Sequence, residues 1–292
     1  MDTFNTTSNL SKTGRPRKTD RHTDLNILRE WTMNPTLPPR QIISNLKLNI
    51  SKSTVKRRIK SKGLSGFIAV KKPFINLRNR KRRVALAKEL MLRPKRFWRR
   101  VIWSDEKKFE LMGCKRRVIV YRRPGERYKL KYMRPTMKHG GGSLMLWGCL
   151  SYYGTGSLVI VNGIMTQHVY REILEDNLQF SADLMGIGHR FVFQQDLDPK
   201  HTAPASRDYF AENNISLLKW SPQSPDLNII EHAWEYLDRH VPVSARTNKV
   251  RFLKALRETW DQMPKEQIKT LVESVPRRLE AIIEAKGAPT RY

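Results

Sequence analysis

The sequence predicts an α/β domain with a mixed sheet, preceded by a small all-α helix-turn-helix domain. Three observations predict this class. Apolar residues recur at helical spacing three times between residues 20 and 64, apolar strand-like runs alternate with helical patterns after residue 100, and the two parts differ sharply in charge. A chain of 292 residues is long enough for about two domains, each with its own core.

The charge of the chain is concentrated at one end. The sequence holds 56 Lys+Arg against 27 Asp+Glu, a net charge of +29. Residues 1–100 hold 27 of the basic and 5 of the acidic side chains, a net +22, which leaves +7 for the remainder. A surplus that serves only as a solvated surface would be spread evenly, so this distribution favours a polyanionic partner. Nucleic acid is favoured over membrane because the basic part lacks an amphipathic helix with a broad apolar face.

Composition also excludes several classes of protein. No run approaches the roughly 18 apolar residues that a membrane span requires, and the N-terminal segment lacks a signal-peptide pattern. Two cysteines, Cys114 and Cys149, are too few for a disulfide framework or a four-thiolate zinc site. We therefore expect no membrane association and a reducing compartment.

Residues 1–19 are expected to form a disordered basic arm. Its basic element is Gly14-Arg15-Pro16-Arg17-Lys18, in which Arg15, Arg17 and Lys18 are candidate DNA contacts. An extended Arg-Pro-Arg backbone can lie in an A·T-rich minor groove. Nuclear-import signals and plain tails carry similar runs, so these alternatives stay open.

Residues 20–64 predict three short helices. The first opens near Asp20, the second follows Pro38-Pro39, and the third begins at Ser51 or Ser53. Two helices followed by a basic third one predict a helix-turn-helix, with residues 51–62 in the major groove. The alternative is an ordinary three-helix bundle with a solvated basic helix. The candidate DNA contacts on the third helix are Lys52, Lys56, Arg57 and Arg58.

Residues 65–99 read as a basic linker with one short helix, and residues 100–292 as the α/β domain. Strands are expected at 101–105, 117–121, 143–149, 157–161, 191–196 and 215–220, and helices at 166–178, 201–213 and 228–240. Strand-like segments come first, and helices and strands then alternate, which is the order that predicts the mixed sheet.

Three carboxylates mark a candidate site in this domain. Asp105 and Asp196 each end an apolar strand, and Glu231 lies on the following helix. If the two strands are neighbours, their aspartates meet at one sheet edge and Glu231 can join them. Such a site suits Mg²⁺, and two ions about 3.5–4 Å apart would assist phosphodiester cleavage. Alternatively, the aspartates only terminate strands, and Glu231 completes a capping box with Asn228.

Two histidines stand beside these carboxylates. His201 follows Asp196 closely and His232 is adjacent to Glu231, but oxygen ligands suffice for Mg²⁺. We therefore expect both histidines to support the site or to face the substrate. Asp198 either assists Asp196 or marks the entry to a helix before Pro199.

Several separated motifs carry a family resemblance. They are Trp103-Ser104-Asp105-Glu106, Lys138-His139-Gly140-Gly141-Gly142-Ser143, Leu146-Trp147-Gly148-Cys149, Gln195-Asp196 with Asp198-Pro199-Lys200-His201-Thr202, and Gln223-Ser224-Pro225-Asp226-Leu227-Asn228 with Ile230-Glu231. Together they resemble the mariner/Tc superfamily of DNA transposases, especially its Tc branch. The 34 residues between Asp196 and Glu231 are typical of that branch.

The resemblance implies a ribonuclease-H-like fold for residues 100–292. It implies that Asp105, Asp196 and Glu231 form a catalytic triad that binds two Mg²⁺ ions, for which Mn²⁺ can substitute. The implied activity is cut-and-paste transposition, in which element ends are cleaved and joined to TA target sites. The implied partner is double-stranded DNA, at inverted repeats and at the target; a homodimer fits this scheme, and the implied location is the nucleus.

Departures from the family pattern keep other functions open. Only 13 residues precede Gly14, where the family usually has a further helix-turn-helix subdomain, and Leu197 stands where Asn is usual. A polar neighbour of a metal ligand can serve to orient it. A DNA-binding regulator or an inactive truncated relic is therefore the alternative. A ribonuclease-H-type nuclease acting on hybrid RNA matches the triad but not the helix-turn-helix.

Overall fold

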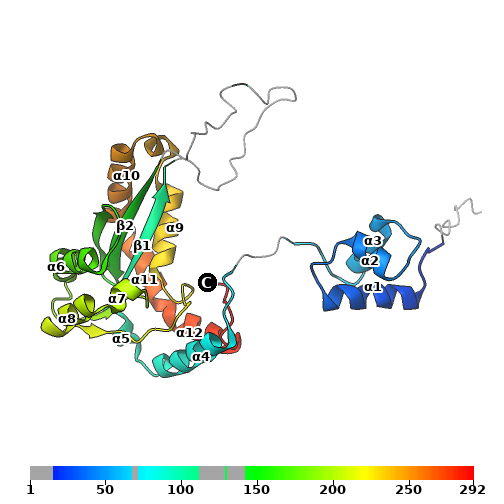
Figure 1. The fold of residues 1–292 in the computed structure, drawn as a ribbon, viewed down its shortest axis with the longest axis horizontal. Coiled ribbons are helices and arrows are strands. Elements are labelled where there is room, and N and C mark those ends of the chain that lie inside the picture. The colour runs from blue at the N-terminus through cyan, green and yellow to red at the C-terminus, as the bar shows by residue number, and fades with distance from the viewer. Residues whose placement is uncertain (1–15, 68–71, 112–128, 130–141) are drawn as a thin grey trace, which may run out of the picture. The chain divides into compact units, whose positions relative to one another are not determined.

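The computed structural model describes residues 16–67, 72–111, 129 and 142–292 (Figure 1). The chain divides into two compact units, residues 1–71 and residues 72–292. The strand expected at 117–121 and the candidate DNA contact Arg15 lie outside the described residues. No helix in the described ranges is both long enough and apolar enough to span a bilayer.

The first unit is the three-helix domain that the sequence predicts. Its helices are α1 (Arg21–Met33), α2 (Pro39–Asn45) and α3 (Lys52–Lys60). Asp20 caps α1 by accepting from the backbone N of Thr23, and Ser51, not Ser53, caps α3. The small core consists of Ile27, Ile42, Val55 and Ile59. Each of the three helices therefore buries one apolar face against the other two, as the apolar spacing in the sequence predicts.

The second unit is built on a five-stranded mixed sheet in the order β3-β2-β1-β4-β5. The strands are β1 (Val101–Glu110), β2 (Ser143–Ser151), β3 (Gly154–Val161), β4 (Val192–Gln194) and β5 (Ser216–Leu217). The pairs β1–β2 and β2–β3 are antiparallel, whereas β1–β4 and β4–β5 are parallel. The predicted mixed sheet is confirmed.

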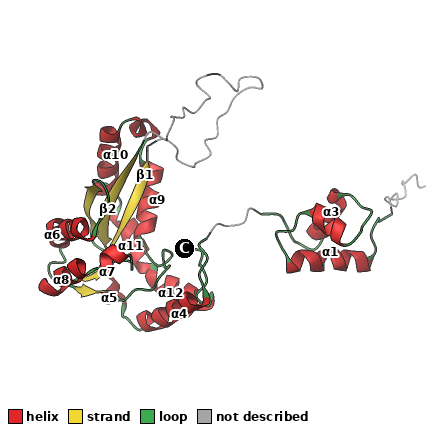
Figure 2. Ribbon diagram, in the orientation of Figure 1, coloured by secondary structure: helices red, strands yellow, loops and turns green. Residues whose placement is uncertain are grey.

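Helices cover both faces of this sheet (Figures 1 and 2). One face packs against α6 (Gln167–Leu184) and α8 (Pro204–Glu212), and the other against α9 (Ile230–His240), α10 (Lys249–Asp261), α11 (Lys265–Glu273) and α12 (Val275–Glu284). Successive strand residues point to opposite faces, so Ile102 joins the first core and Trp103 the second. The sheet is thus a rigid central layer.

The segment expected as a linker contributes a helix to the second unit. The helix α4 (Leu77–Met91) packs against α12, and α5 (Lys95–Trp98) leads into β1. The contact is close, because a Cβ added at Gly287, whose φ is +79°, would collide with the carbonyl oxygen of Arg80. The compact grouping therefore places residues 72–99 with the α/β unit.

The register between β1 and β4 positions the candidate site. Trp103 pairs with Gln194, and the hydroxyl of Ser104 donates to the carbonyl oxygen of Gln194 at 2.9 Å. Asp105 lies two residues beyond Trp103 on β1, and Asp196 lies two residues beyond Gln194, in the segment that follows β4. The neighbouring strands on which the predicted carboxylate pair depends are therefore present.

Candidate active site

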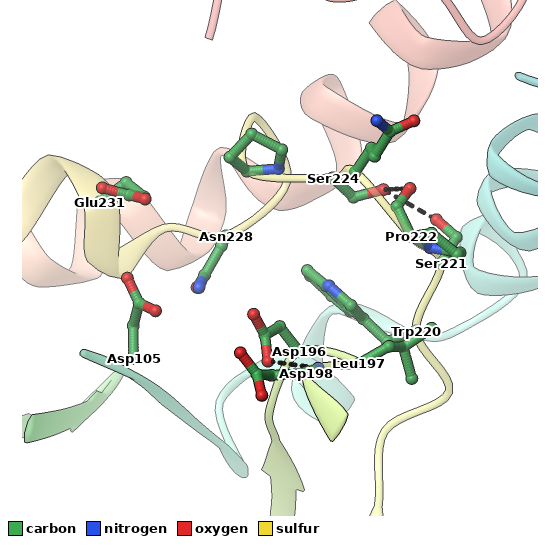
Figure 3. A pocket seen from close by; sticks show the side chains of 12 residues that line it. Asp105, Asp196, Leu197, Asp198, Trp220, Ser221, Pro222, Ser224, Asn228 and Glu231 are labelled. Atoms are coloured by element: carbon green, nitrogen blue, oxygen red, sulfur yellow. Dashed lines mark hydrogen bonds between the residues drawn. The ribbon is translucent and has the colours of Figure 1, made fainter. Parts of the chain in front are cut away.

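A cavity of about 300 Å³ opens at this edge of the sheet (Figure 3). It is lined by Asp105 from β1, Asp196 from the segment after β4, and Glu231 from the first turn of α9. The loop between β5 and α9 closes another side with Trp220 and residues 221–225. The three carboxylates that the sequence predicts to be neighbours thus face one cavity.

Asp105 is held in a position that disfavours its charge. Its Oδ2 accepts a hydrogen bond from the indole Nε1 of Trp234 at 3.1 Å. Burial, followed by the negative charges of Glu231 and Glu106, raises the pKa of Asp105 to about 7. A nearby cation would therefore favour the deprotonated, charged form of Asp105.

Asp196 is oriented by a buried histidine. Its Oδ1 lies 2.6 Å from Nδ1 of His201, while Nε2 of His201 lies 3.0 Å from Oε1 of Glu106. Burial lowers the pKa of His201, but the bonds and charges of the two carboxylates outweigh it and raise the pKa to about 9. The charged imidazolium then donates to both carboxylates. His201 thus contacts Asp196 directly, which fits the supporting role, one of the two that the sequence predicts for it.

Glu231 pairs with a lysine on β1, the strand that also carries Asp105. Its Oε2 lies 3.0 Å from Nζ of Lys107, and each side chain is about one-third exposed. The helix α9 has Ile229 as its N-cap and carries no side-chain cap bond. The alternative in which Glu231 and Asn228 form a capping box is therefore wrong, because the chain already has helical dihedrals at Ile229 and Asn228 lies one residue before the cap.

The other polar residues near the carboxylates have separate roles. Asp198 caps the short helix α7 (Pro199–Thr202) by accepting from the backbone N of Lys200, and it also borders the cavity. His232 does not line the cavity; its Nδ1 lies 3.4 Å from Nη2 of Arg278. Leu197 lines the cavity and is 44% exposed.

The carboxylate oxygens that line the cavity suit a hard cation, although the three carboxylates do not lie close together in this structure. Within the described ranges, no three His, Cys, Asp or Glu side chains lie close enough to hold one metal ion. Their carboxylates bond to neighbouring side chains instead. Even so, three carboxylates line one cavity, and the buried Oδ1 of Asn228 beside them has no hydrogen-bond partner in the described part of the chain.

The basic residues expected to contact DNA fall into two groups. Arg17, Lys18, Lys52, Lys56 and Arg57 are exposed. Arg58 instead turns inward, where its Nε lies 2.8 Å from the hydroxyl of Thr19 and 3.2 Å from Oδ1 of Asp24. The structure thus ties Arg58 to the start of α1 and leaves the other described candidates exposed at the surface.

Sequence reasoning missed three residues of the site. Lys107 stands two positions after Asp105 on β1 and so shares its face, a signal that strand alternation offers. Glu106 points to the other face and reaches His201. Asn228 was considered only as a helix cap. Its burial in the cavity depends on the course of the preceding loop, which no local pattern specifies.

Comparisons with known proteins agree with the two units. A family model described as Transposase matches residues 24–91, and the DDE superfamily endonuclease model matches residues 100–257, more than half of the chain. The Tcb1 transposase of Caenorhabditis briggsae is 40% identical over 277 residues, covering 92% of this chain and 100% of that protein. The Tc1 transposase of Caenorhabditis elegans is 42% identical over 273 residues, with the same two coverages.

Solved structures show the same fold. A Mos1 transposase paired-end complex with the left transposon end has a TM-score of 0.82 at 20% identity, covering 97% of this chain and 83% of that one. The ribonuclease-H-like architecture with a helix-turn-helix domain is thereby confirmed. Given the matches to the endonuclease model and to the Tcb1 and Tc1 proteins, the chain belongs to the Tc1/mariner family of transposases.

Proposed function

We propose that this DNA transposase carries out its phosphodiester chemistry in the cavity formed by Asp105, Asp196 and Glu231. The observation that carries the proposal is that Asp105, Asp196 and Glu231 line one cavity, at the edge where β1 and β4 are neighbours. Three convergent acidic groups on neighbouring elements form a site for oxygen-preferring cations. The DDE superfamily endonuclease match over residues 100–257 supports the same chemistry.

Asp105, Asp196 and Glu231 would hold two Mg²⁺ ions, or Mn²⁺ in their place. Structures of the Mos1 paired-end complex have been solved with Mg and with Mn, which supports the use of divalent metal in this fold. When bound, Mg²⁺ supplies positive charge that activates an attacking oxygen and stabilises the departing one.

The chain's own residues prepare this site. His201 and Glu106 fix the carboxylate of Asp196, and Trp234 fixes that of Asp105. Lys107 pairs with Glu231 and so balances its negative charge while no cation is bound. Water attacks a phosphodiester at the element end, and the liberated 3′-hydroxyl then attacks a TA target in the same cavity. No covalent protein intermediate is needed.

The first unit delivers DNA to this cavity. We assign α3 to the major groove, with Lys52, Lys56 and Arg57 as contacts, and the arm that holds Arg17 and Lys18 to the minor groove. The partner is double-stranded DNA, at the inverted repeats and at the target, in the nucleus. Paired-end complexes of the Mos1 transposase support assembly of two copies.

The alternative function is a DNA-binding regulator or an inactive relic. The observation that favours it is Leu197, an exposed apolar side chain in the cavity beside Asp196. It offers no hydrogen bond that could orient a ligand.

One experiment separates the two functions. The purified chain is incubated with a duplex that carries the inverted repeats of its own element, in Mg²⁺ or in EDTA. The proposal expects cleavage at the repeat ends in Mg²⁺ and none in EDTA. Binding in both conditions without cleavage in either would support the regulator.

A further inference from the structure

Asn228 is a buried amide on the wall of the candidate metal cavity. Its side chain is almost fully buried, and it lines the cavity together with Asp105, Asp196 and Glu231. Figure 3 shows it directed from the start of α9 into the space beside the two aspartates. The backbone N of Asn228 donates to the carbonyl oxygen of Pro225 at 3.1 Å, which fixes the position of its Cα. We infer that Asn228 supplies a neutral oxygen ligand, its side-chain Oδ1, to the divalent cation of the proposed function.

The amide of Asn228 has no hydrogen-bonding role among the residues that the structure describes. Neither its oxygen nor its nitrogen hydrogen-bonds another described residue, and Oδ1 is buried. It does not cap α9. The loop beside it is fixed by other groups, since Asp226 binds Arg83 and Thr290. A buried polar group without a partner costs free energy, so its presence points to a partner other than the described residues.

The position of its side chain distinguishes Asn228 from the other residues that have a buried polar atom without a hydrogen bond. Within the described ranges, buried side-chain atoms without a hydrogen bond also occur in Asp24, Trp103, Trp147 and Gln194, but Asn228 is the member of that set that lines the carboxylate cavity. A species bound in the cavity would therefore be within reach of this amide.

The chemistry of the cavity favours a cation as that partner. Asp105, Asp196 and Glu231 already bring the negative charge that attracts a cation, and an amide oxygen adds a further ligand without adding charge. In Figure 3 the amide nitrogen faces the aspartates, as expected for a donor beside carboxylates. Because no described residue holds either amide atom, a half-turn of the terminal torsion presents Oδ1 to a bound ion.

The inference rests on the proposed metal site and is tested with Mn²⁺ alone, titrated into the full chain and followed by electron paramagnetic resonance. We expect Asn228→Ala to weaken Mn²⁺ binding about tenfold. Asn228→Asp, which keeps an oxygen in the same place, should restore the affinity. Asn177→Ala removes an amide on α6 that bonds the carbonyl oxygen of Ile173, and it should leave the affinity unchanged.

Thermal melting distinguishes a ligand from a structural residue. Without metal, Asn228→Ala should melt no earlier than the wild type, and its gain in melting temperature on adding Mn²⁺ should shrink. If Asn228→Ala binds Mn²⁺ as the wild type does while Asp105→Asn does not, the role of Asn228 is overturned and the metal site stands. An affinity loss that Asn228→Asp fails to restore also overturns it. If the wild type binds no Mn²⁺, both proposals fall together.

Discussion

Arg83 and Asp226, which are 143 residues apart in the sequence, form a buried bidentate ion pair. Nη1 donates to Oδ1 at 2.8 Å and Nη2 donates to Oδ2 at 2.6 Å. Oδ2 also accepts from the backbone N and the hydroxyl of Thr290, at 3.1 and 2.9 Å. The pair therefore joins α4 and the C-terminal segment to the loop that leads to Asn228 and Glu231.

Replacing Arg83 by Met should destabilise the second unit severely. The variant leaves the charge of Asp226 buried without its partner, which costs about 3–5 kcal/mol of unfolding free energy. Urea denaturation followed by tryptophan fluorescence measures this, since six of the seven tryptophans lie in residues 72–292. Arg82→Met, at an exposed neighbouring position, should change it by less than about 0.5 kcal/mol. Equal effects of the two variants would show that the pair does not fix this loop.

The same pair predicts how stability depends on pH. Burial alone raises the pKa of Asp226, but the hydrogen bonds and charge of Arg83, together with Thr290, outweigh it and leave the pKa lowered. The stability that the pair contributes is therefore fully present above the unfolded pKa of about 3.9 and is lost as the pH falls through the folded value. The difference in urea midpoint between wild type and Asp226→Asn should shrink below about pH 4. A constant difference would exclude this linkage.

Replacing Lys107 by Met should strengthen metal binding. The ammonium group holds the carboxylate of Glu231 at 3.0 Å and so competes with a cation for it. Because both side chains are partly exposed, we expect an effect of a few-fold, equivalent to about 1 kcal/mol or less. Mn²⁺ titration measures it, with Lys108→Met on the opposite face of β1 as the control. Weaker binding in Lys107→Met would refute the competition.

A salt-dependence experiment should distinguish Lys56, which we expect to contact a phosphate, from Arg58, which we expect to stabilise the first unit. For binding of the full chain to a duplex, each phosphate contact adds about one to the slope of log affinity against log salt concentration. Lys56→Ala should reduce this slope by about one. Arg58→Ala should leave the slope unchanged and instead loosen the first unit, because Arg58 bonds Thr19 and Asp24. Equal slopes for Lys56→Ala and wild type would remove Lys56 from the interface.

Much of the sheet and the identity of its carboxylates follow from the sequence. Asp105 and Asp196 each end an apolar run, so once the strands are neighbours their meeting is a matter of register. The basic composition of the segment that contains Arg83 gives no sign that this side chain is buried, whereas the structure leaves it only 1% exposed. Its partner Asp226 lies far away in the sequence, and no local pattern reveals such a pair. The same limit applies to Asn228, whose missing partner is visible only in the folded cavity.

The most direct test of the central claim is single-turnover cleavage of inverted-repeat DNA in Mg²⁺ by Asp196→Asn. We expect DNA binding close to that of the wild type and a loss of cleavage rate of about a thousandfold or more, because Asp196 acts on the reaction and not on duplex recognition. Asp208→Asn, an exposed position on α8 outside the cavity, serves as the matched control and should cleave normally. An Asp196→Asn protein that still cuts at the wild-type rate would contradict the assignment of this cavity as the active site.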